Sequence, residues 1–244
     1  MSSLSATEAS DASGERGRRI ALATGAVLLV DDKLPIAPLE TLFSAERWSL
    51  TATPRGRGDS CFVEDDQVRW VWRPFRRGGL VGRIVKSRYL FLGEERVRAF
   101  REWRLLAELK ELGLPVPRPV AARYHRRGFA YSADLLVERV EGAETLSARL
   151  PEAVSDGGWE QIGRCLRRFH DHGVYHADLN AHNVLLVGAE DVYLIDFDRG
   201  ELREPGSWRE ANLARLRRSL DKLAPGEPAV NRGWDLLLSA YTRG

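Results

Sequence analysis

The residues most able to do chemistry lie in two short polar segments of the C-terminal half. Residues 176–183 read HADLNAHN, which fits H-x-D-L-x-x-x-N, and Asp196 stands thirteen residues after Asn183 in LIDFD. Phosphoryl transfer needs a carboxylate at the attacking hydroxyl and oxygen ligands that hold a divalent metal against the phosphates. We therefore expect Asp178 to orient the acceptor hydroxyl and accept its proton, Asn183 to bind one Mg2+ ion, and Asp196 to bridge metal and phosphates.

The same stretch is compatible with two alternative roles. Asp and Asn most often build turns in loops, but two segments in the order and spacing typical of kinases favour the catalytic interpretation. A His/Asp metal hydrolase is the second alternative, although no HExxH-type pair is present. Four of the five histidines lie here, namely His170, His172, His176 and His182. His176 is expected to pack and form hydrogen bonds.

A nucleotide site would need residues from the N-terminal half. Gly56 and Gly58 are closely spaced between expected strands, where a glycine loop would cover the phosphates, and a plain turn explains them equally well. Arg73 stands where protein kinases carry a lysine, and its guanidinium can bind phosphate through two hydrogen bonds. Glu102 is predicted to hold Arg73, with Glu95 as the second choice and surface ion pairs as the alternative for both.

The patterning predicts an α+β chain with two lobes. Strand-like stretches at 48–75, 120–124 and 135–140 surround a helix at 94–112, which predicts an N-lobe of residues 18–140 with a small antiparallel sheet and one main helix. By analogy with the kinase fold, the backbone from Glu138 to Val140 is expected to contact adenine, with a packed strand as the alternative.

The remaining chain predicts a mostly helical C-lobe of residues 141–244. An amphipathic helix ends near Gly173, two short strands follow at 184–187 and 192–195, and two helices close the chain. Residues 1–17 are small and polar, so they are expected to form a disordered tail.

Composition narrows the class of protein. With 43% hydrophobic and 30% charged residues, the 244-residue chain is typical of a soluble globular protein. The apolar run at 20–30 is too short for a membrane span and follows an acidic, serine-rich start, so neither a span nor a signal peptide is expected. Cys61 and Cys165 show no CxxC spacing, which argues against a disulfide framework or a zinc knuckle and fits a reducing cytoplasm.

Positive charge is concentrated in residues 69–104, which hold eleven Lys or Arg against three Glu, a net charge of +8 in a chain of net +2. An anionic partner is expected there, with a solvated helical face as the alternative. Nucleic acid is a weaker candidate, because aromatic residues lie in the segment but no recognised reader motif accompanies them.

Taken together, these segments resemble the 3-deoxy-D-manno-octulosonic acid (Kdo) kinase family, lipopolysaccharide-core kinases of the protein-kinase-like superfamily. Residues 175–186 (YHADLNAHNVLL) and 194–200 (LIDFDRG) look like that family's catalytic and metal loops, with Asp198 in place of the protein-kinase DFG glycine. Residues 76–92 and 113–122 are similar to its N-lobe segments. The likeness runs from about residue 48 to the C-terminus.

The resemblance implies transfer of the γ-phosphate of ATP, with Mg2+, to the 4-hydroxyl of Kdo on a lipid A precursor. It also implies a peripheral location on the cytoplasmic side of the bacterial inner membrane and no nucleic-acid partner. Basic side chains would then contact lipid phosphates or the Kdo carboxylate on the anionic membrane surface. These residues are Arg76, Arg77, Arg83, Lys86 and Arg88.

Several functions remain open on the sequence alone. A lipopolysaccharide heptose kinase would share the fold and the chemistry and differ only in its acceptor pocket. A small-molecule phosphotransferase or an atypical protein kinase explains the basic segment less well. From a different class, a catalytically inactive kinase-like module would use the same groove to hold glycolipid or nucleotide, and the arginine at position 73 leaves that alternative open.

Overall fold

The computed structural model describes residues 16–34, 38–52, 60–66, 68–75, 89–150, 154–188 and 191–243. These residues form two compact units, the first from the chain up to Ala107 with Arg118–Arg139, the second from Glu108–Pro117 with Val140–Gly244. The chain passes for the last time from the first unit to the second between Arg139 and Val140, one residue before the boundary predicted between residues 140 and 141. Residues 1–15 of the predicted tail lie outside the described ranges.

The segment Glu108–Pro117 was expected in the N-lobe, but it belongs to the second unit. Two hydrogen bonds join it to that unit. The Leu194 amide donates to the Pro115 carbonyl oxygen at 3.1 Å, and the Arg168 guanidinium donates to the Gly113 carbonyl oxygen at 3.1 Å. Bonds of this kind satisfy the polar backbone of the segment within the second unit.

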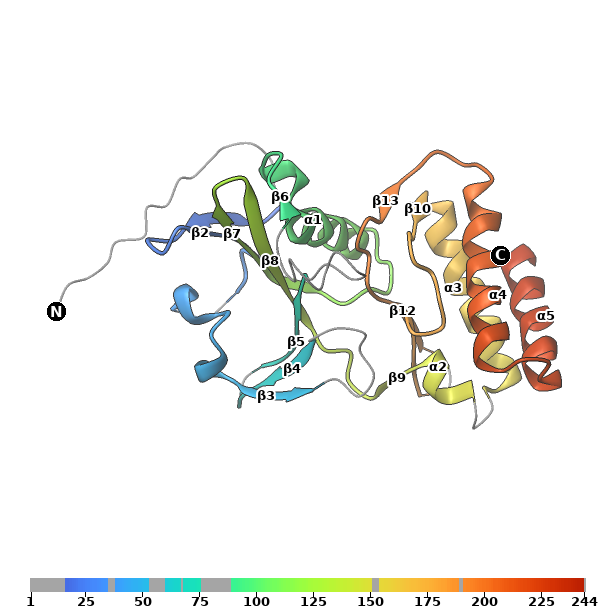
Figure 1. Ribbon diagram of the computed structural model, residues 1–244. Coiled ribbons are helices and arrows are strands. Elements are labelled where there is room, and N and C mark those ends of the chain that lie inside the picture. Colours follow the sequence, from blue (N-terminus) through green and yellow to red (C-terminus); the bar gives the residue numbers. More distant parts are fainter. Residues whose placement is uncertain are drawn as a thin grey trace. The chain divides into compact units, whose positions relative to one another are not determined.

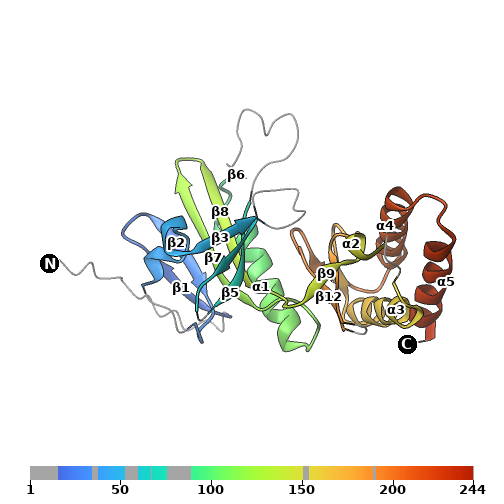
Figure 2. The same cartoon turned by 90° about the horizontal axis from the view of Figure 1, so that it is seen from below.

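Within the described residues, an antiparallel sheet of eight strands dominates the first unit, with the long β7–β8 hairpin at its centre (Figures 1 and 2). The order is β1-β2-β7-β8-β5-β4-β3, and β6 also pairs with β8. The strands are β1 (Arg18–Ala21), β2 (Ala26–Val30), β3 (Ser49–Ala52), β4 (Cys61–Glu64), β5 (Arg69–Pro74), β6 (Tyr89–Leu90), β7 (Pro119–Arg127) and β8 (Ala130–Glu138). This sheet confirms the predicted antiparallel architecture.

The apolar run at 20–30 forms the β1–β2 hairpin, which the sequence pattern did not predict. The chain turns at Gly25, whose φ of 81° is a conformation that side chains other than glycine rarely adopt. The Leu22 amide donates to the Ala26 carbonyl oxygen at 2.9 Å and closes the turn. The run is therefore two short strands, with Leu28, Leu29 and Val30 fully buried.

The two faces of the sheet have different coverings. On one face lies α1 (Arg98–Glu111), where Phe100 meets Tyr124 with ring centroids 5.2 Å apart. The other face carries a core that includes Leu28, Leu136 and Trp70 and is joined by Phe43 and Trp48 from the 3-10 turns η1 (Leu39–Thr41) and η2 (Ala45–Arg47) and the residues beside them. Because side chains alternate along a strand, each strand contributes to both faces.

The helix expected at 94–112 is interrupted at its start. A 3-10 turn, η4 (Glu94–Arg96), is followed by Val97 in an extended conformation with ψ of 119°, and only then does α1 begin. The Tyr131 hydroxyl accepts a hydrogen bond from the Arg98 amide at 3.2 Å, which satisfies one of the unpaired N–H groups at the helix start.

Helices predominate in the second unit (Figure 1), and α3 packs against α5, as Figure 2 shows. A Cβ atom at Gly163 would lie 2.2 Å from the Leu237 carbonyl oxygen, so this close packing requires glycine. The helices are α2 (Leu146–Arg149), α3 (Asp156–Asp171), α4 (Trp208–Leu223) and α5 (Pro228–Arg243). None of the described helices has both the length and the apolar character needed to cross a bilayer.

Two small antiparallel sheets complete the second unit. One has the order β12-β11-β9 and consists of β9 (Ala143–Thr145), β11 (Val184–Val187) and β12 (Asp191–Leu194). The other pairs β10 (Val174–Tyr175) with β13 (Glu201–Leu202). Together with α3, these strands hold the polar segments singled out in the sequence.

Candidate active site

The β11–β12 hairpin brings Asn183 and Asp196 to the same end of one small sheet. Val184 pairs with Leu194 in the antiparallel register, and the Ile195 amide donates to the Asn183 carbonyl oxygen at 3.1 Å. Asp196 follows directly and has a φ of 64°, in the left-handed region that Asp tolerates better than most residues. The strained backbone aims the segment after β12 in a direction that an extended strand would not take.

Asn183 is buried and ties the two polar segments together. Its Nδ2 donates to the Asp178 carbonyl oxygen at 2.9 Å, and within the described chain no hydrogen bond reaches its Oδ1. The amide oxygen therefore remains available as a ligand. Together with the Asp196 carboxylate it offers the hard oxygen donors that Mg2+ prefers, so these residues fit a divalent cation whose remaining ligands would be water and phosphate.

His176 is a buried structural element of the same loop. The Asp178 amide donates to its Nδ1 at 3.2 Å, which leaves Nε2 to donate to the Ile195 carbonyl oxygen at 2.9 Å. This pattern requires the neutral ring protonated at Nε2. Burial lowers the pKa of His176 below its usual value, which agrees with a ring that stays neutral.

The Asp178 carboxylate, by contrast, reaches solvent. Its side chain is 54% exposed, and its Oδ1 accepts a hydrogen bond from Nη1 of Arg215 at 3.2 Å. Its backbone oxygen also accepts a bond from Nδ2 of Asn180 at 2.9 Å. The backbone is thus held on several sides while the carboxylate stays accessible, as a group that must meet a substrate hydroxyl requires.

One face of α4 binds the catalytic loop, residues 176–183, and sequence reasoning missed it. Asn212 is buried, accepts from the His176 amide at 3.2 Å and donates to the His176 carbonyl oxygen at 3.1 Å. The Ala181 amide donates to the Ser219 hydroxyl at 3.1 Å. Asn212, Arg215 and Ser219 lie at i, i+3 and i+7, so a polar stripe at helical spacing was the available signal.

In the first unit, Arg73 on β5 forms an ion pair with Glu102 on α1, the partner expected from the sequence. Glu102 is buried, and the Arg73 guanidinium lies 5.0 Å from the centre of the Phe75 ring. The second choice was wrong, because Glu95 precedes α1 and pairs with Arg104 at 2.9 Å. The pair holds a cation in place on the sheet.

The remaining predicted nucleotide contacts are placed only in part. Gly56 and Gly58 lie outside the described residues, as does the basic group from Arg76 to Arg88. Glu138 ends β8, where its amide donates to the Arg118 carbonyl oxygen at 2.9 Å and its carboxylate accepts from Arg118 at 3.1 Å. Val140 lies in the second unit, at the start of its longer segment. The Glu138 amide is therefore already used within the first unit.

The clustered histidines do not converge on one point. The Nδ1 atoms of His170, His172 and His182 meet three different groups at 2.8 Å, namely the Tyr241 hydroxyl, the Arg168 carbonyl oxygen and the Ser147 hydroxyl. Nothing in the described ranges gathers three or more His, Cys, Asp or Glu side chains around a common metal position. These separate contacts disfavour a His/Asp hydrolase site.

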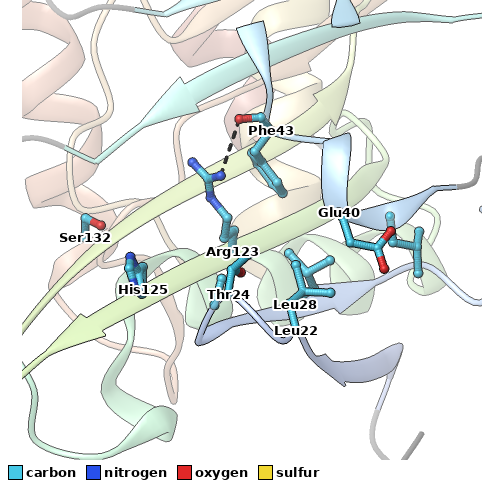
Figure 3. A pocket seen from close by; sticks show the side chains of 10 residues that line it. Leu22, Thr24, Leu28, Glu40, Phe43, Arg123, His125 and Ser132 are labelled. Atoms are coloured by element: carbon cyan, nitrogen blue, oxygen red, sulfur yellow. Dashed lines mark hydrogen bonds between the residues drawn. The ribbon is translucent and has the colours of Figure 1, made fainter. Parts of the chain in front are cut away.

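A cavity of about 260 Å³ lies in the first unit, lined by residues that include Leu22, Leu28, Phe43 and His125 (Figure 3). Arg123 points across it to the Phe43 carbonyl oxygen at 3.3 Å and also pairs with Asp134 at 2.7 Å. Asp134 accepts from Trp72 as well, and Arg73 follows Trp72 on β5. Alternation therefore places Arg73 on the other face of the sheet, away from this cavity.

Comparison with known proteins finds one matching family model. The model described as "Lipopolysaccharide kinase (Kdo/WaaP) family" matches residues 42–241. Relatives named 3-deoxy-D-manno-octulosonic acid kinase include proteins from three genera. One from Stenotrophomonas maltophilia (strain K279a) is 46% identical, with 84% of each chain covered. One from Xanthomonas campestris pv. campestris (strain B100) is 44% identical, with 89% of each covered, and one from Xylella fastidiosa (strain M12) is 47% identical, with 82% of this chain and 83% of the relative covered.

A solved structure has a similar fold. The microcompartment-associated aminopropanol kinase superposes with a TM-score of 0.56 at 14% sequence identity, covering 82% of this chain and 76% of that chain. At so low an identity the likeness concerns the fold alone. It confirms the predicted kinase-like α+β fold.

Proposed function

The chain belongs to the lipopolysaccharide kinase (Kdo/WaaP) family, and from that premise we propose that it transfers the γ-phosphoryl group of ATP to the 4-hydroxyl of Kdo on a lipid A precursor. The observation that carries the chemistry is the joining of Asp178, Asn183 and Asp196 by one hydrogen-bonded hairpin and loop. The choice of acceptor is supported by relatives at 44–47% identity that are named for Kdo.

The proposed reaction is a direct displacement at phosphorus. The acceptor hydroxyl oxygen forms a bond to the γ-phosphorus while the bond from that phosphorus to the β–γ bridging oxygen breaks, and ADP leaves. Asp178 receives the hydroxyl proton, because its carboxylate is exposed while its backbone is fixed by Asn180 and Asn183. When bound, Mg2+ supplies charge neutralisation on the phosphates, and Asn183 and Asp196 would hold it.

Arg73 is proposed to bind the phosphates of ATP. Glu102 fixes the guanidinium through a buried carboxylate, which is the role that the helix glutamate has for the usual lysine. The planar fork of arginine can bind two phosphate oxygens at once, which a lysine cannot do in the same way. An arginine at this position is therefore compatible with an active kinase.

The direct test offers purified protein γ-labelled ATP and Mg2+ with Kdo-bearing lipid A precursor, with Kdo-free precursor and with a heptose-bearing core lipid. We expect label on the Kdo-bearing lipid alone, and none with the Asp178→Asn variant, which keeps the side-chain shape. Label on heptose would instead assign a heptose kinase. Nucleotide binding without label on any lipid would indicate an inactive binding module.

A peripheral position on an anionic membrane is proposed as the working location. It is supported by an apolar tip on the first unit, formed by Leu90, Leu92 and Phe129, which are 57%, 57% and 84% exposed. The Phe91 amide donates to the Phe129 carbonyl oxygen at 2.8 Å, so the two segments lie together, and Arg126 and Arg127 are exposed on the same hairpin. Apolar side chains flanked by cations suit insertion at an anionic lipid surface.

Vesicle sedimentation tests this location. The protein should sediment with phosphatidylglycerol vesicles and much less with phosphatidylcholine vesicles. Phe129→Ser should weaken binding by about 10-fold or more, since a buried Phe contributes about 1.5–3 kcal/mol. Leu202→Ser, which changes a leucine of the second unit that is 42% exposed, is the matched control and should bind as the wild type does. Equal binding by both variants would rule out the tip.

A further inference from the structure

Arg215 reaches the catalytic carboxylate and keeps most of its hydrogen-bonding capacity unused. Its Nη1 donates to Oδ1 of Asp178 at 3.2 Å, and this is its one hydrogen bond within the part of the chain that the structure describes. A guanidinium carries five N–H donors in a planar fork. The side chain is 46% exposed, so the remaining donors can meet a ligand from solvent.

Holding the catalytic loop does not explain Arg215. Asn212 already binds both backbone groups of His176, and Ser219 binds the Ala181 amide. An ion pair between two half-exposed side chains contributes only about 0–1 kcal/mol to stability. A cation at this position of the polar stripe on α4 is therefore better explained by an anionic ligand that binds to it.

The arrangement around Asp178 offers two neighbouring positions of different chemistry. Oδ1 faces Arg215, whereas Oδ2 accepts no hydrogen bond from the described residues. An acceptor hydroxyl can therefore donate to Oδ2 while an anionic group of the same molecule binds the adjacent guanidinium. Arginine pairs with carboxylates through two parallel hydrogen bonds, which fixes orientation as well as charge.

We propose that Arg215 binds the carboxylate of the acceptor sugar acid and thereby selects an acidic sugar, an inference that rests on the proposed function. In Kdo the carboxylate is attached to the anomeric carbon, two ring positions from the 4-hydroxyl, so one sugar presents both groups on a short scaffold. A neutral heptose would offer no anion to the remaining donors of the guanidinium, so Arg215 would favour the acidic sugar over it.

A phosphate of the nucleotide is the competing oxyanion. The acid is favoured because Arg215 contacts Asp178, the residue assigned to the acceptor hydroxyl. The phosphates are assigned instead to the metal held by Asn183 and Asp196 and to Arg73. The two sources differ in which Michaelis constant responds when Arg215 is changed, so kinetics separates them.

The experiment compares Kdo-bearing lipid with its primary carboxamide analogue, which keeps the shape and removes the charge, in the wild type and in Arg215→Ala. The wild type should prefer the acid by about 10- to 100-fold in kcat/KM, the range of a charged hydrogen-bonded contact. Arg215→Ala should lose that preference through a raised KM for the acid, with an unchanged KM for ATP. Arg215→Lys should keep part of it, because it retains the charge without the fork.

Arg217→Ala is the matched control. It removes an arginine two residues along the same helix, about 200° around the axis, where it pairs with Asp221 at 2.8 Å. This variant should retain the full preference for the acid. A preference that survives in Arg215→Ala, or a rise in the KM for ATP alone, would overturn the inference. If the wild type labels no Kdo-bearing lipid, the proposed function falls and this inference falls with it.

Discussion

Arg73 and Glu102 form an ion pair whose two ends have different surroundings. The Glu102 side chain is 2% exposed and the Arg73 side chain 21% exposed. A carboxylate so deeply buried is costly unless a cation compensates it. The buried end therefore anchors the pair, and the guanidinium at the other end can face a ligand while fixed to α1.

Removing the cation should cost stability as well as nucleotide binding. Arg73→Ala is expected to lower the free energy of unfolding by about 3–5 kcal/mol, because it leaves the buried Glu102 charge without this partner. Urea unfolding measures the loss. The double variant Arg73→Ala with Glu102→Gln should recover much of the stability but not the KM for ATP. A double variant that restores ATP binding would mean that Arg73 acts only through the fold.

The Arg73–Glu102 pairing was predictable because local patterns fix both residues. Arg73 lies in a strand rich in aromatic and β-branched residues, and Glu102 lies among the helical repeats of Phe100, Trp103 and Leu106. Glu95 was a wrong second choice because α1 begins at Arg98, later than the sequence pattern predicts. Whether Val97 is helical or extended depends on the packing of η4 and not on the propensities of the segment alone.

The α4 contacts could not be predicted with the same ease. Asn212 and His176 are 36 positions apart in sequence, and nothing in either segment indicates the other. The leucines of α4, such as Leu216 and Leu220, mark its apolar face, and the polar stripe beside them was assigned no role from the sequence. In the same way, the length of the apolar run at 20–30 excluded a membrane span but did not show that Gly25 divides it into two strands.

Substitution of Asn212 should show whether α4 positions the catalytic loop for the reaction. Asn212→Leu keeps the branching of the side chain but leaves the His176 amide and carbonyl groups without partners, at about 1–3 kcal/mol for each buried group. A displaced loop should also lower kcat by about 100-fold, since small misplacements at the reacting centre have effects of that size. Steady-state kinetics and urea unfolding give both numbers.

A second substitution serves as the comparison for this prediction. Asn212→Asp keeps the acceptor for the His176 amide and loses the donor to its carbonyl oxygen, so its kcat should fall between those of the wild type and Asn212→Leu. Because it also buries a carboxylate, it should lose at least as much stability as Asn212→Leu. The KM for ATP should not change in either variant. A loss of stability with normal kcat would show that Asn212 does not position the loop for catalysis.

His170 should make stability depend on pH on the acidic side of neutrality. Burial lowers the pKa of His170 from 6.5 to about 4. Between those values the unfolded chain binds a proton that the folded chain does not, so the free energy of unfolding falls as the pH decreases, by up to about 3 kcal/mol from this group. The contribution is fully present above pH 6.5 and lost towards pH 4.

Urea unfolding at several pH values between 7.5 and 4.5 checks this dependence. His170→Gln cannot take up the proton and should therefore have a shallower decline in stability than the wild type. Its absolute stability should be lower at pH 7.5, since the 2.8 Å bond to the Tyr241 hydroxyl is disturbed. Parallel curves for the two proteins would contradict the assignment to His170.

The Mg2+ requirement of the reaction should rise when Asn183 or Asp196 is replaced. Chelation with EDTA should abolish transfer, and added Mg2+ should restore it. Asp196→Asn removes the charge while retaining a residue type that tolerates the φ of 64° at this position, and Asn183→Ala removes the amide oxygen. Each should raise the Mg2+ concentration for half-maximal activity by about 10-fold or more, which a loss of about 1.4 kcal/mol in binding would produce.

Asp191→Asn provides the matched control for the metal, because Asp191 is exposed at the opposite end of the β11–β12 hairpin and pairs with Val187. Its Mg2+ requirement should equal that of the wild type. Electron paramagnetic resonance with Mn2+ and ADP gives a second readout that does not depend on turnover. Weaker Mn2+ binding in Asp196→Asn, but not in Asp191→Asn, would place the metal ligand at residue 196. Equal binding in both would mean that the reduced activity of Asp196→Asn has another cause. Loss of a metal ligand must lower the affinity for the ion whether or not the acceptor is present.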